Sequence, residues 1–251
     1  MIKSSDILLS LKNISKSFRD TDSNLKVLNN FSLDIGKGEF VSILGPSGCG
    51  KSTLLKICSS MILQDSGTVS ILGLNVNTPD KKRILMLQDD NQLFPWLTVE
   101  QNVAFSTTST GSTRRESDLS NLLDMAGLGE FSRYYPHQLS GGMKKRTALA
   151  RALAGDPEIL FMDEPFGSLD PGIKIKLQKF LLDIWKKYKK TIIFVTHDVQ
   201  EAIRLGQRII IMDDLASIVC DEIIPEIDEK GLSNDIFFEL YRKYYSLLST
   251  G

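Results

Sequence analysis

The sequence has little of several features that mark broad classes of protein. It holds 3 cysteines among 251 residues, and Cys49, Cys58 and Cys220 lack the spacing of zinc ligands. A small, odd number of cysteines argues against a disulfide framework and is typical of a reducing cytosol. The formal net charge is −1, so the chain lacks the strongly basic face of a nucleic-acid-binding protein. We therefore expect no nucleic acid among its partners.

Long apolar runs are also missing. The longest apolar runs, such as those at 159–162 and 192–195, are far shorter than the ~20 residues that a membrane-spanning helix needs. Residues 1–10 lack the charged leader, apolar core and cleavage site of a secretory signal. Hydrophobic residues make up 42% and charged residues 24% of the chain, which is ordinary for a soluble globular protein with a full core. We expect the apolar runs to form strands.

The sequence does contain a phosphate-binding loop. Residues 45–53 fit the pattern G-x-x-x-x-G-K-[ST] and follow an apolar run at 40–44 that predicts a buried strand. Glycines let the backbone turn tightly and aim its N–H groups at phosphate, and the following helix adds unpaired donors and a favourable dipole. A ligand-free glycine-rich turn is disfavoured by this strand-then-helix context. The predicted nucleotide-binding residues are Gly45, Pro46, Ser47, Gly48, Cys49, Gly50, Lys51, Ser52 and Thr53.

Two acidic residues mark a second part of the predicted site. The apolar run at 159–162 leads directly into Asp163 and Glu164. In the phosphate-loop pattern the lysine, Lys51, reaches the β- and γ-phosphates, and the hydroxyl of Ser52 binds Mg²⁺. Asp163 suits the role of holding Mg²⁺ directly or through water, and Glu164 suits the role of polarising the attacking water. Two acids after a strand more often form a plain turn, and their combination with the phosphate loop is what favours a nucleotide hydrolase.

Cys49 lies inside the phosphate loop, beside Gly50 and Lys51. A helix N-terminus and an ammonium group both favour the thiolate, which predicts a reactive thiol whose alkylation blocks nucleotide binding. The alternative is a small side chain that points away from the phosphates into apolar surroundings, where the thiol is inert. The sequence leaves both possibilities open.

The order of predicted elements indicates an α/β fold. Alternating apolar residues predict antiparallel strands near 7–17 and 27–35. Apolar runs predict further strands at 40–44, 67–72, 83–87, 159–162, 191–195, 208–212 and 215–220. Apolar residues at helical spacing predict helices at 52–62, 142–154, from 171 onward and at 234–248, and shorter amphipathic segments between 98 and 129. We expect a P-loop NTPase core with an N-terminal antiparallel β subdomain and a helical insertion.

These elements predict a single ATP-binding domain over residues 1–251. Its core would comprise 1–88 and 155–251, and its helical subdomain would comprise 89–154. The sequence shows no internal repeat and no low-complexity linker that would divide the chain further.

Several more short motifs follow one another along the chain. Gln88 ends a predicted strand, Leu-Ser-Gly-Gly-Met stands at 139–143, Ser-Leu-Asp stands at 168–170, and His197 follows another strand. In this order they resemble the Q-loop, signature motif, D-loop and switch histidine of the ATP-binding subunit of ABC transporters, and the resemblance covers nearly the whole chain. Phe18 fits the aromatic residue that stacks on adenine in that family, although a phenylalanine after a strand is also often plain core.

The resemblance implies a site shared between two copies of the chain. In the family each ATP lies between the phosphate loop of one subunit and the signature motif of the other, so Ser140, Gly141 and Gly142 would act on the partner's nucleotide. A helix that starts with two glycines agrees with this, because such a terminus binds anions. The resemblance further implies ATP and Mg²⁺ as cofactors. It assigns catalysis to Glu164, His197, Gln88 and Lys51, nucleotide contacts also to Asp170, and magnesium contacts to Ser52, Gln88 and Asp163.

The resemblance also implies partners and a location. These are transmembrane permease subunits and, indirectly, a solute-binding protein, with the chain peripheral on the cytoplasmic face of the cell membrane. The sequence at 93–99 and Met143 are similar to the nitrate, sulfonate and taurine import branch, whereas Met143 and Lys145 replace glutamines of many members. The alternatives are an efflux or lipoprotein-release subunit and a non-hydrolysing ATP-binding scaffold. The presence of both Glu164 and His197 argues against the scaffold.

Apolar side chains in the loop 91–96 predict a docking surface. Leu93, Phe94 and Trp96 lie in an otherwise polar segment close to Gln88, and exposed aromatic residues are typical of a protein interface. We expect Gln88 and this loop to form the docking surface for the membrane subunit. The alternative is that these side chains cover the protein's own core, and their removal would then lower its stability.

Overall fold

The computed structural model describes residues 6–19, 24–87, 92–110, 116–167, 169–224 and 233–249. Two predicted motif residues, Gln88 and Ser168, lie outside the described residues, as does Asn91 of the predicted docking loop. The chain divides into two compact units. The first comprises 1–79, 161–163 and 190–251, and the second comprises 80–160 and 164–189. Among the described residues, no helix combines the length and apolar character needed to cross a membrane.

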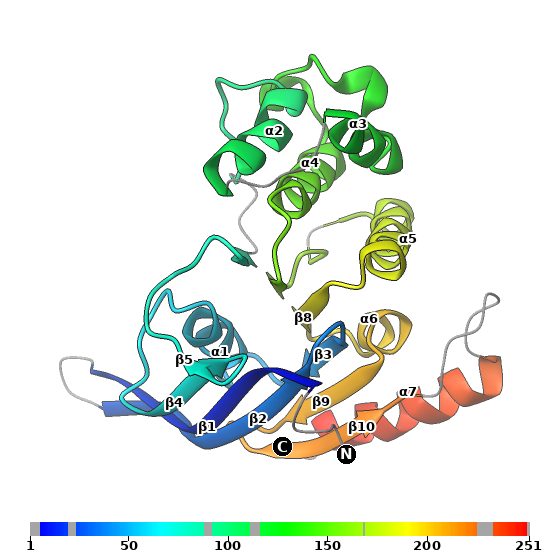
Figure 1. Ribbon diagram of the computed structural model, residues 1–251. Helices are drawn as coiled ribbons and strands as arrows, with labels where there is room; N and C mark the ends of the chain where they lie inside the picture. The colour runs from blue at the N-terminus through cyan, green and yellow to red at the C-terminus, as the bar shows by residue number, and fades with distance from the viewer. Residues whose placement is uncertain are drawn as a thin grey trace. The chain divides into compact units, whose positions relative to one another are not determined.

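An antiparallel sheet forms part of the first unit. Its strands lie in the order β2-β1-β4-β5 and are drawn in blue to cyan in Figure 1. They are β1 (Ile7–Arg19), β2 (Asn24–Gly36), β4 (Ser66–Ile71) and β5 (Leu74–Asn75). Leu8, Leu9, Ser10 and Leu11 of β1 are all buried, so both faces of the strand are covered over these residues, whereas Lys12 is exposed. The predicted antiparallel strands are confirmed.

A second sheet carries the phosphate loop. Strand β3 (Phe40–Leu44) lies between two parallel neighbours, β8 (Thr191–Val195) and β9 (Arg208–Met212). Every residue of β3 and β8 is buried, which explains their continuous apolar runs. Parallel strands end at the same edge of a sheet, so the loop after β3 and His197 after β8 belong to one edge. Strand β7 (Ile159–Asp163) is the neighbour of β8, and β10 (Ile218–Ile223) pairs antiparallel with β9.

The helix predicted at 52–62 ends at Cys58, and the two-residue strand β5 is not among the predicted strands. Two further segments differ from the sequence prediction. The sequence predicts the last strand at 215–220, but Asp213 Oδ1 accepts hydrogen bonds from the N–H groups of Leu215 (3.0 Å) and Ser217 (2.7 Å). This turn delays β10 to Ile218. Helix α6 (Val199–Leu205) is not predicted at all, although Asp198 caps it by accepting hydrogen bonds from its first-turn N–H groups. An aspartate followed three residues later by a glutamate is a helix-start signal in the sequence.

The C-terminal helix α7 (Asn234–Ser249) confirms the predicted amphipathic helix. Its buried Leu240 and Tyr244 pack in one cluster with Leu44 at the end of β3 and Val199 at the start of α6. Lys243 Nζ and the Tyr244 hydroxyl both donate hydrogen bonds to Oε2 of Glu222 in β10, at 2.6 and 3.1 Å. Helix α7 therefore supports both the strand before the phosphate loop and the helix after His197.

The second unit is mainly helical. Helices α2, α3 and α4 stand together in green in Figure 1, and α4 contacts both of the others. The helices are α2 (Val99–Thr110), α3 (Glu116–Met125), α4 (Gly141–Ala154) and α5 (Pro171–Tyr188). Short 3-10 turns stand at Gly129–Phe131 and Pro136–Gln138, and strand β6 (Arg83–Met86) precedes the helices in the chain. The predicted helices of the insertion and the predicted helix after Pro171 are confirmed.

Candidate functional site

The phosphate loop enters α1 (Lys51–Cys58) through Gly50. Gly50 has a φ of 101°, and a Cβ there would lie 2.9 Å from the carbonyl oxygen of Val27, so only glycine fits. No described side chain caps α1, and Leu54 donates a helical hydrogen bond to the Gly50 carbonyl at 2.8 Å. The N–H groups ahead of Leu54 have no helical carbonyl to which they can donate. This helix start therefore offers backbone donors to an anion.

Lys51 brings a positive charge into the loop. The residue is 6% exposed, and its Nζ donates hydrogen bonds to the carbonyl oxygens of Gly45 and Pro46, both at 2.7 Å. A buried ammonium group needs such partners, because burial without hydrogen bonds strongly disfavours a charge. The ammonium group thus lies among the backbone groups of the loop itself.

The surroundings of the Cys49 thiol do not favour the thiolate that its position in the sequence suggested. The residue is 3% exposed, and burial raises the pKa of its thiol above the ordinary value. The Lys51 ammonium, with Nζ 3.7 Å from Sγ, lowers the pKa but only partly offsets the effect of burial. The burial favours the alternative of an inert thiol, and the reactive thiol stays a prediction that labelling can test.

Two more predicted site residues belong to the first unit. Asp163 is the last residue of β7 and is buried, and His197 is exposed directly after β8. The turn that presents His197 is held by its neighbour Thr196, whose Oγ1 donates to Glu201 Oε2 at 2.6 Å and accepts from the Asp198 N–H at 3.0 Å. The hydrogen bond between Thr196 and Glu201 is buried. It therefore fixes the connection between β8 and α6.

Phe18 lies near the end of β1 and is 42% exposed, so it is not plain core. Lys16 Nζ lies 5.5 Å from the centre of the Phe18 ring, a cation–π distance, and forms an ion pair with Asp65 at 2.7 Å. An exposed ring held in this way can stack on a flat ligand, and adenine stacking by Phe18 stays a prediction.

The signature segment of the second unit begins α4. Ser140 is the N-cap residue, and its Oγ accepts a hydrogen bond from the Met143 N–H at 3.3 Å. Ser140 and Gly141 are exposed, whereas Gly142 is buried against Ile173 of α5. A Cβ at Gly142 would lie 2.5 Å from Ile173 Cγ2, so this close packing requires glycine.

Glu164 and Asp170 also belong to the second unit. Glu164 has a φ of 45°, an uncommon left-handed conformation for a residue with a side chain. Such strain is typically found at functional sites and costs on the order of 1–3 kcal/mol. Asp170 is exposed at the start of α5, where its carbonyl accepts hydrogen bonds from the N–H groups of Ile173 and Lys174 at 3.0 and 2.9 Å. Its carboxylate makes no capping bond to that helix.

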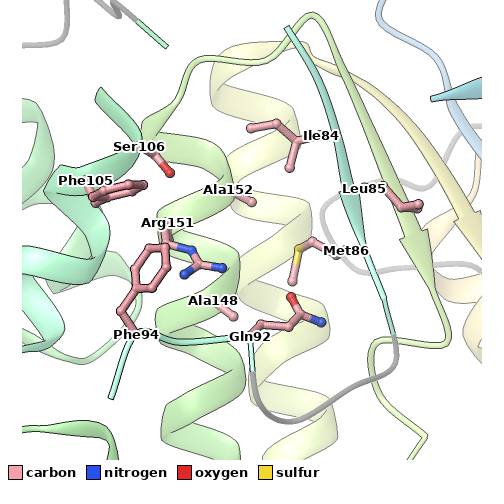
Figure 2. Close-up of a pocket in the computed structure, with 10 residues that line it drawn as sticks. All are labelled: Ile84, Leu85, Met86, Gln92, Phe94, Phe105, Ser106, Ala148, Arg151 and Ala152. Carbon is pink, nitrogen blue, oxygen red and sulfur yellow. The ribbon is translucent and has the colours of Figure 1, made fainter. Parts of the chain in front are cut away.

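A pocket of about 230 Å³ lies within the second unit (Figure 2). Phe94 faces Phe105 with ring centres 4.7 Å apart, and Trp96 lies next to Phe94 at 5.5 Å. Leu93 is buried, while Trp96 is 69% exposed. The predicted docking loop therefore divides its apolar side chains between core and surface. The side chains that line the pocket include Met86, Gln92, Phe94, Phe105, Ala148 and Arg151.

Sequence reasoning missed three residues that organise these sites. Asn102 is fully buried and holds the loop, since its Oδ1 accepts from the Phe94 N–H at 2.9 Å and its Nδ2 donates to the Leu97 carbonyl at 2.9 Å. Glu201 secures the His197 turn, and Arg151 points into the pocket, as Figure 2 shows. A polar residue on the apolar face of a predicted helix was the available signal for Asn102.

Comparison with known proteins agrees with these features. The ABC transporter family model matches residues 28–167. The aliphatic sulfonates import ATP-binding protein SsuB of Bacillus cereus is 43% identical over 204 residues, covering 81% of this chain and 80% of that protein. The taurine import ATP-binding protein TauB of Roseobacter denitrificans is 39% identical over 231 residues, covering 91% of this chain and 86% of that protein.

Solved structures agree in fold as well as in sequence. A dimeric structure of MJ0796, a bacterial ABC transporter cassette, has a TM-score of 0.76 and 34% identity, covering 87% of this chain and 100% of that one. A post-hydrolysis state of the same cassette, bound to ADP and Pi, has a TM-score of 0.75 and 33% identity. The predicted P-loop NTPase fold with its β subdomain and helical insertion is confirmed. The chain belongs to the ABC transporter family, as one of its ATP-binding cassettes.

Proposed function

We propose that this cassette binds and hydrolyses Mg-ATP to power solute import. The observation that carries the proposal is the start of α1, where an uncapped helix terminus and the buried ammonium of Lys51 meet. Backbone donors and a fixed cation in one loop suit a triphosphate, which carries several negative charges close together. The import relatives support the direction of transport.

The residues present fit magnesium bound together with the nucleotide. Among the described residues, no group of three or more His, Cys, Asp or Glu side chains forms a self-contained metal site. Mg²⁺ usually binds through one or two carboxylates and the phosphates of its substrate, so such a cage is not required. The Ser52 hydroxyl, the Asp163 carboxylate and Gln88 would hold the ion, which neutralises the β- and γ-phosphates when bound.

The other predicted catalytic residues would act on the γ-phosphate or on the attacking water. Glu164 would orient and deprotonate the attacking water, His197 would donate a hydrogen bond to a phosphate oxygen, and Asp170 would contact the nucleotide site. Phe18 would stack on adenine. We keep the division of the chain into a core of 1–88 and 155–251 and a helical subdomain of 89–154 as part of the proposal.

The active form in this proposal is a dimer of two copies. Ser140, Gly141 and Gly142 at the start of α4 would contact the ATP that is bound to the phosphate loop of the partner. A second helix terminus with two glycines supports this, because it offers backbone donors to an anion. The dimeric structure of MJ0796 supports the same assembly.

We further propose that the dimer works on the cytoplasmic face of the membrane with permease subunits and a solute-binding protein. Because SsuB and TauB are named for aliphatic sulfonates and taurine, we take a small organic sulfonate as the first solute to test. The permease and the binding protein, not this cassette, would recognise that solute.

Phosphate release tests the proposal in the complex. The cassette purified with its permease should hydrolyse Mg-ATP in detergent or vesicles, and one solute-loaded binding protein should raise the turnover. The same preparation without Mg²⁺ serves as the control. A complex that binds ATP but releases no phosphate under any of these conditions would identify a scaffold instead.

A further inference from the structure

Asp65 holds the end of the strand that carries Phe18. It lies directly before β4, and its backbone N–H donates a hydrogen bond to the Ser15 carbonyl oxygen at 2.8 Å. Its Oδ2 accepts a hydrogen bond from the Ser17 N–H at 2.7 Å, and its Oδ1 accepts one from Lys16 Nζ, also at 2.7 Å. One residue therefore bonds to three consecutive residues of β1.

These bonds take over where the pairing of β1 with β4 stops. The last pair between the two strands joins Ser15 and Ser66, before β1 ends. Beyond Ser15, β1 pairs with β2 but no longer with β4 among the described residues. The Ser17 N–H bonds to the Asp65 carboxylate instead. A side chain thus takes the place of a strand neighbour, and it fixes β1 up to the residue before Phe18.

Lys16 links this carboxylate to the Phe18 ring. Its side chain is 17% exposed, and its ammonium group lies 5.5 Å from the centre of the ring. The quadrupole of an aromatic ring attracts a cation at this distance and favours one arrangement of the two side chains. The Phe18 residue is nevertheless 42% exposed. The ring is therefore held in place without being covered.

The β2 strand connects the surroundings of this ring to the phosphate loop. Phe18 pairs with Leu25 of β2, and Val27 lies two residues further along that strand. The Val27 carbonyl oxygen is 2.9 Å from the position that a Cβ of Gly50 would occupy, so β2 contacts the start of α1 there. Two residues of a strand span about 7 Å. A nucleotide bound through its phosphates at α1 would therefore have its base within reach of the Phe18 ring.

We propose that Asp65 and Lys16 are positioning residues for the nucleotide base, which hold the Phe18 ring where the base stacks. The inference rests on the proposed function, because it takes stacking on Phe18 as its starting point. A ring that is fixed in advance binds with a smaller loss of conformational entropy. Stacking uses the face of a base and tolerates different bases, so this support should serve adenine and guanine alike.

Three ligands separate support of the base from support of the phosphates. Phe18→Ala should weaken the binding of Mg-ATP and Mg-GTP to the whole chain about tenfold, because the base loses its stacking partner. Asp65→Ala and Lys16→Met should weaken both roughly three- to fivefold, because the ring remains but is no longer held. Mg-tripolyphosphate has no base, so its binding should be unchanged in all three variants. Titration calorimetry measures each dissociation constant.

A double-mutant cycle tests whether Asp65 and Lys16 act through the ring. In a Phe18→Ala background, Asp65→Ala and Lys16→Met should cause no further loss of ATP affinity, since residues that act through one group are not additive. Lys16→Arg keeps the cation and should stay within about twofold of the wild type. Glu158→Ala is the matched control, because it breaks an ion pair of similar length, 2.8 Å, in the second unit. Melting curves establish that each variant is folded.

Other results would overturn the inference. If Asp65→Ala lowers tripolyphosphate binding as much as ATP binding, or adds its full loss to that of Phe18→Ala, Asp65 supports the fold and not the base. If Phe18→Ala binds ATP as the wild type does, the base does not stack there, although ATP hydrolysis and the proposed function stand. If the wild type binds neither Mg-ATP nor Mg-tripolyphosphate, the proposed function fails and the inference fails with it.

Discussion

Two helices of this cassette, α1 and α4, begin at glycines but differ in how their first N–H groups are satisfied. At α1 the helix enters through Gly50 in a left-handed conformation, and no described side chain caps its N–H groups. At α4 the Oγ of Ser140 accepts a hydrogen bond from the Met143 N–H at 3.3 Å, so the helix is capped by its own chain. The N–H groups of the first terminus are therefore left to water or a ligand, whereas the chain itself satisfies one N–H group of the second.

The difference fits two kinds of anion site. A terminus that serves its own nucleotide can leave its donors open, because Lys51 already holds the loop through the Gly45 and Pro46 carbonyls. In the proposed dimer the start of α4 would contact the nucleotide of the second copy, so this helix start must be stable before that copy binds. The Ser140 hydroxyl accepts from Met143 and still has its own O–H to donate, so capping and binding a partner's phosphate are compatible.

Removing the proposed base while leaving both helix starts intact should have the largest effect. We expect Glu164→Gln to bind Mg-ATP normally and to lose on the order of 10²–10⁴ in turnover, because the attacking water loses its general base. Trapped ATP should then favour the dimer. Phosphate release and light scattering with saturating Mg-ATP measure the two effects, and wild-type turnover or a strictly monomeric variant would contradict the assignment.

The second-largest effect is expected from a substitution in the phosphate loop at the start of α1. Lys51→Ala removes the ammonium group from the phosphate loop and should weaken ATP binding on the order of 100-fold, since hydrogen bonds to charged groups are among the stronger ones. Equilibrium binding of a fluorescent ATP analogue measures the loss. Lys56→Ala, on the same helix but in its last turn, is the control, and equal losses in both variants would point to helix stability instead.

The second terminus can be dissected with two substitutions at one position. Ser140→Ala should cost about 1 kcal/mol of unfolding free energy, because it removes the cap of α4. Ser140→Asp should restore the cap and the stability. Its negative charge should nevertheless weaken the ATP-dependent dimer about tenfold or more, because in the proposed dimer it would face the partner's phosphates. Thermal unfolding and dimerisation of both variants in a Glu164→Gln background test this, and a dimer that follows stability alone would remove Ser140 from the partner's site.

The smallest effect is expected at Cys49. Its raised pKa predicts slow inactivation by maleimides at neutral pH, with a rate that rises about tenfold for each pH unit as the thiolate fraction grows. Cys49→Ala should retain most of the activity. Mass spectrometry of the labelled protein over a pH series gives the rate at each thiol, and rapid labelling of Cys49 at neutral pH would show that burial does not control it.

The sequence alone determined those features whose chemistry is local. The phosphate loop could be recognised because its donors are consecutive backbone groups between a strand and a helix. The buried strands could be recognised because parallel strands covered on both faces require continuous apolar runs, as at Phe40–Leu44. The roles of Glu164, His197 and Gln88 come from resemblance and stay predictions. The α/β fold and the family followed from the order of these local signals.

Only the tertiary structure decided the features that depend on neighbours distant in the chain. Burial raises the pKa of Cys49 despite the adjacent Lys51, and no local pattern shows how deeply a loop residue is covered. The docking loop divides into buried Leu93 and exposed Trp96 because Asn102 fixes its backbone from the next helix. Arg146 and Arg151 look alike in sequence, yet the end of α3 supplies acceptors to Arg146, while Arg151 Nη1 remains unpaired among the described residues. Which donor is satisfied is a property of packed elements, because hydrogen bonds join groups that only the fold brings together.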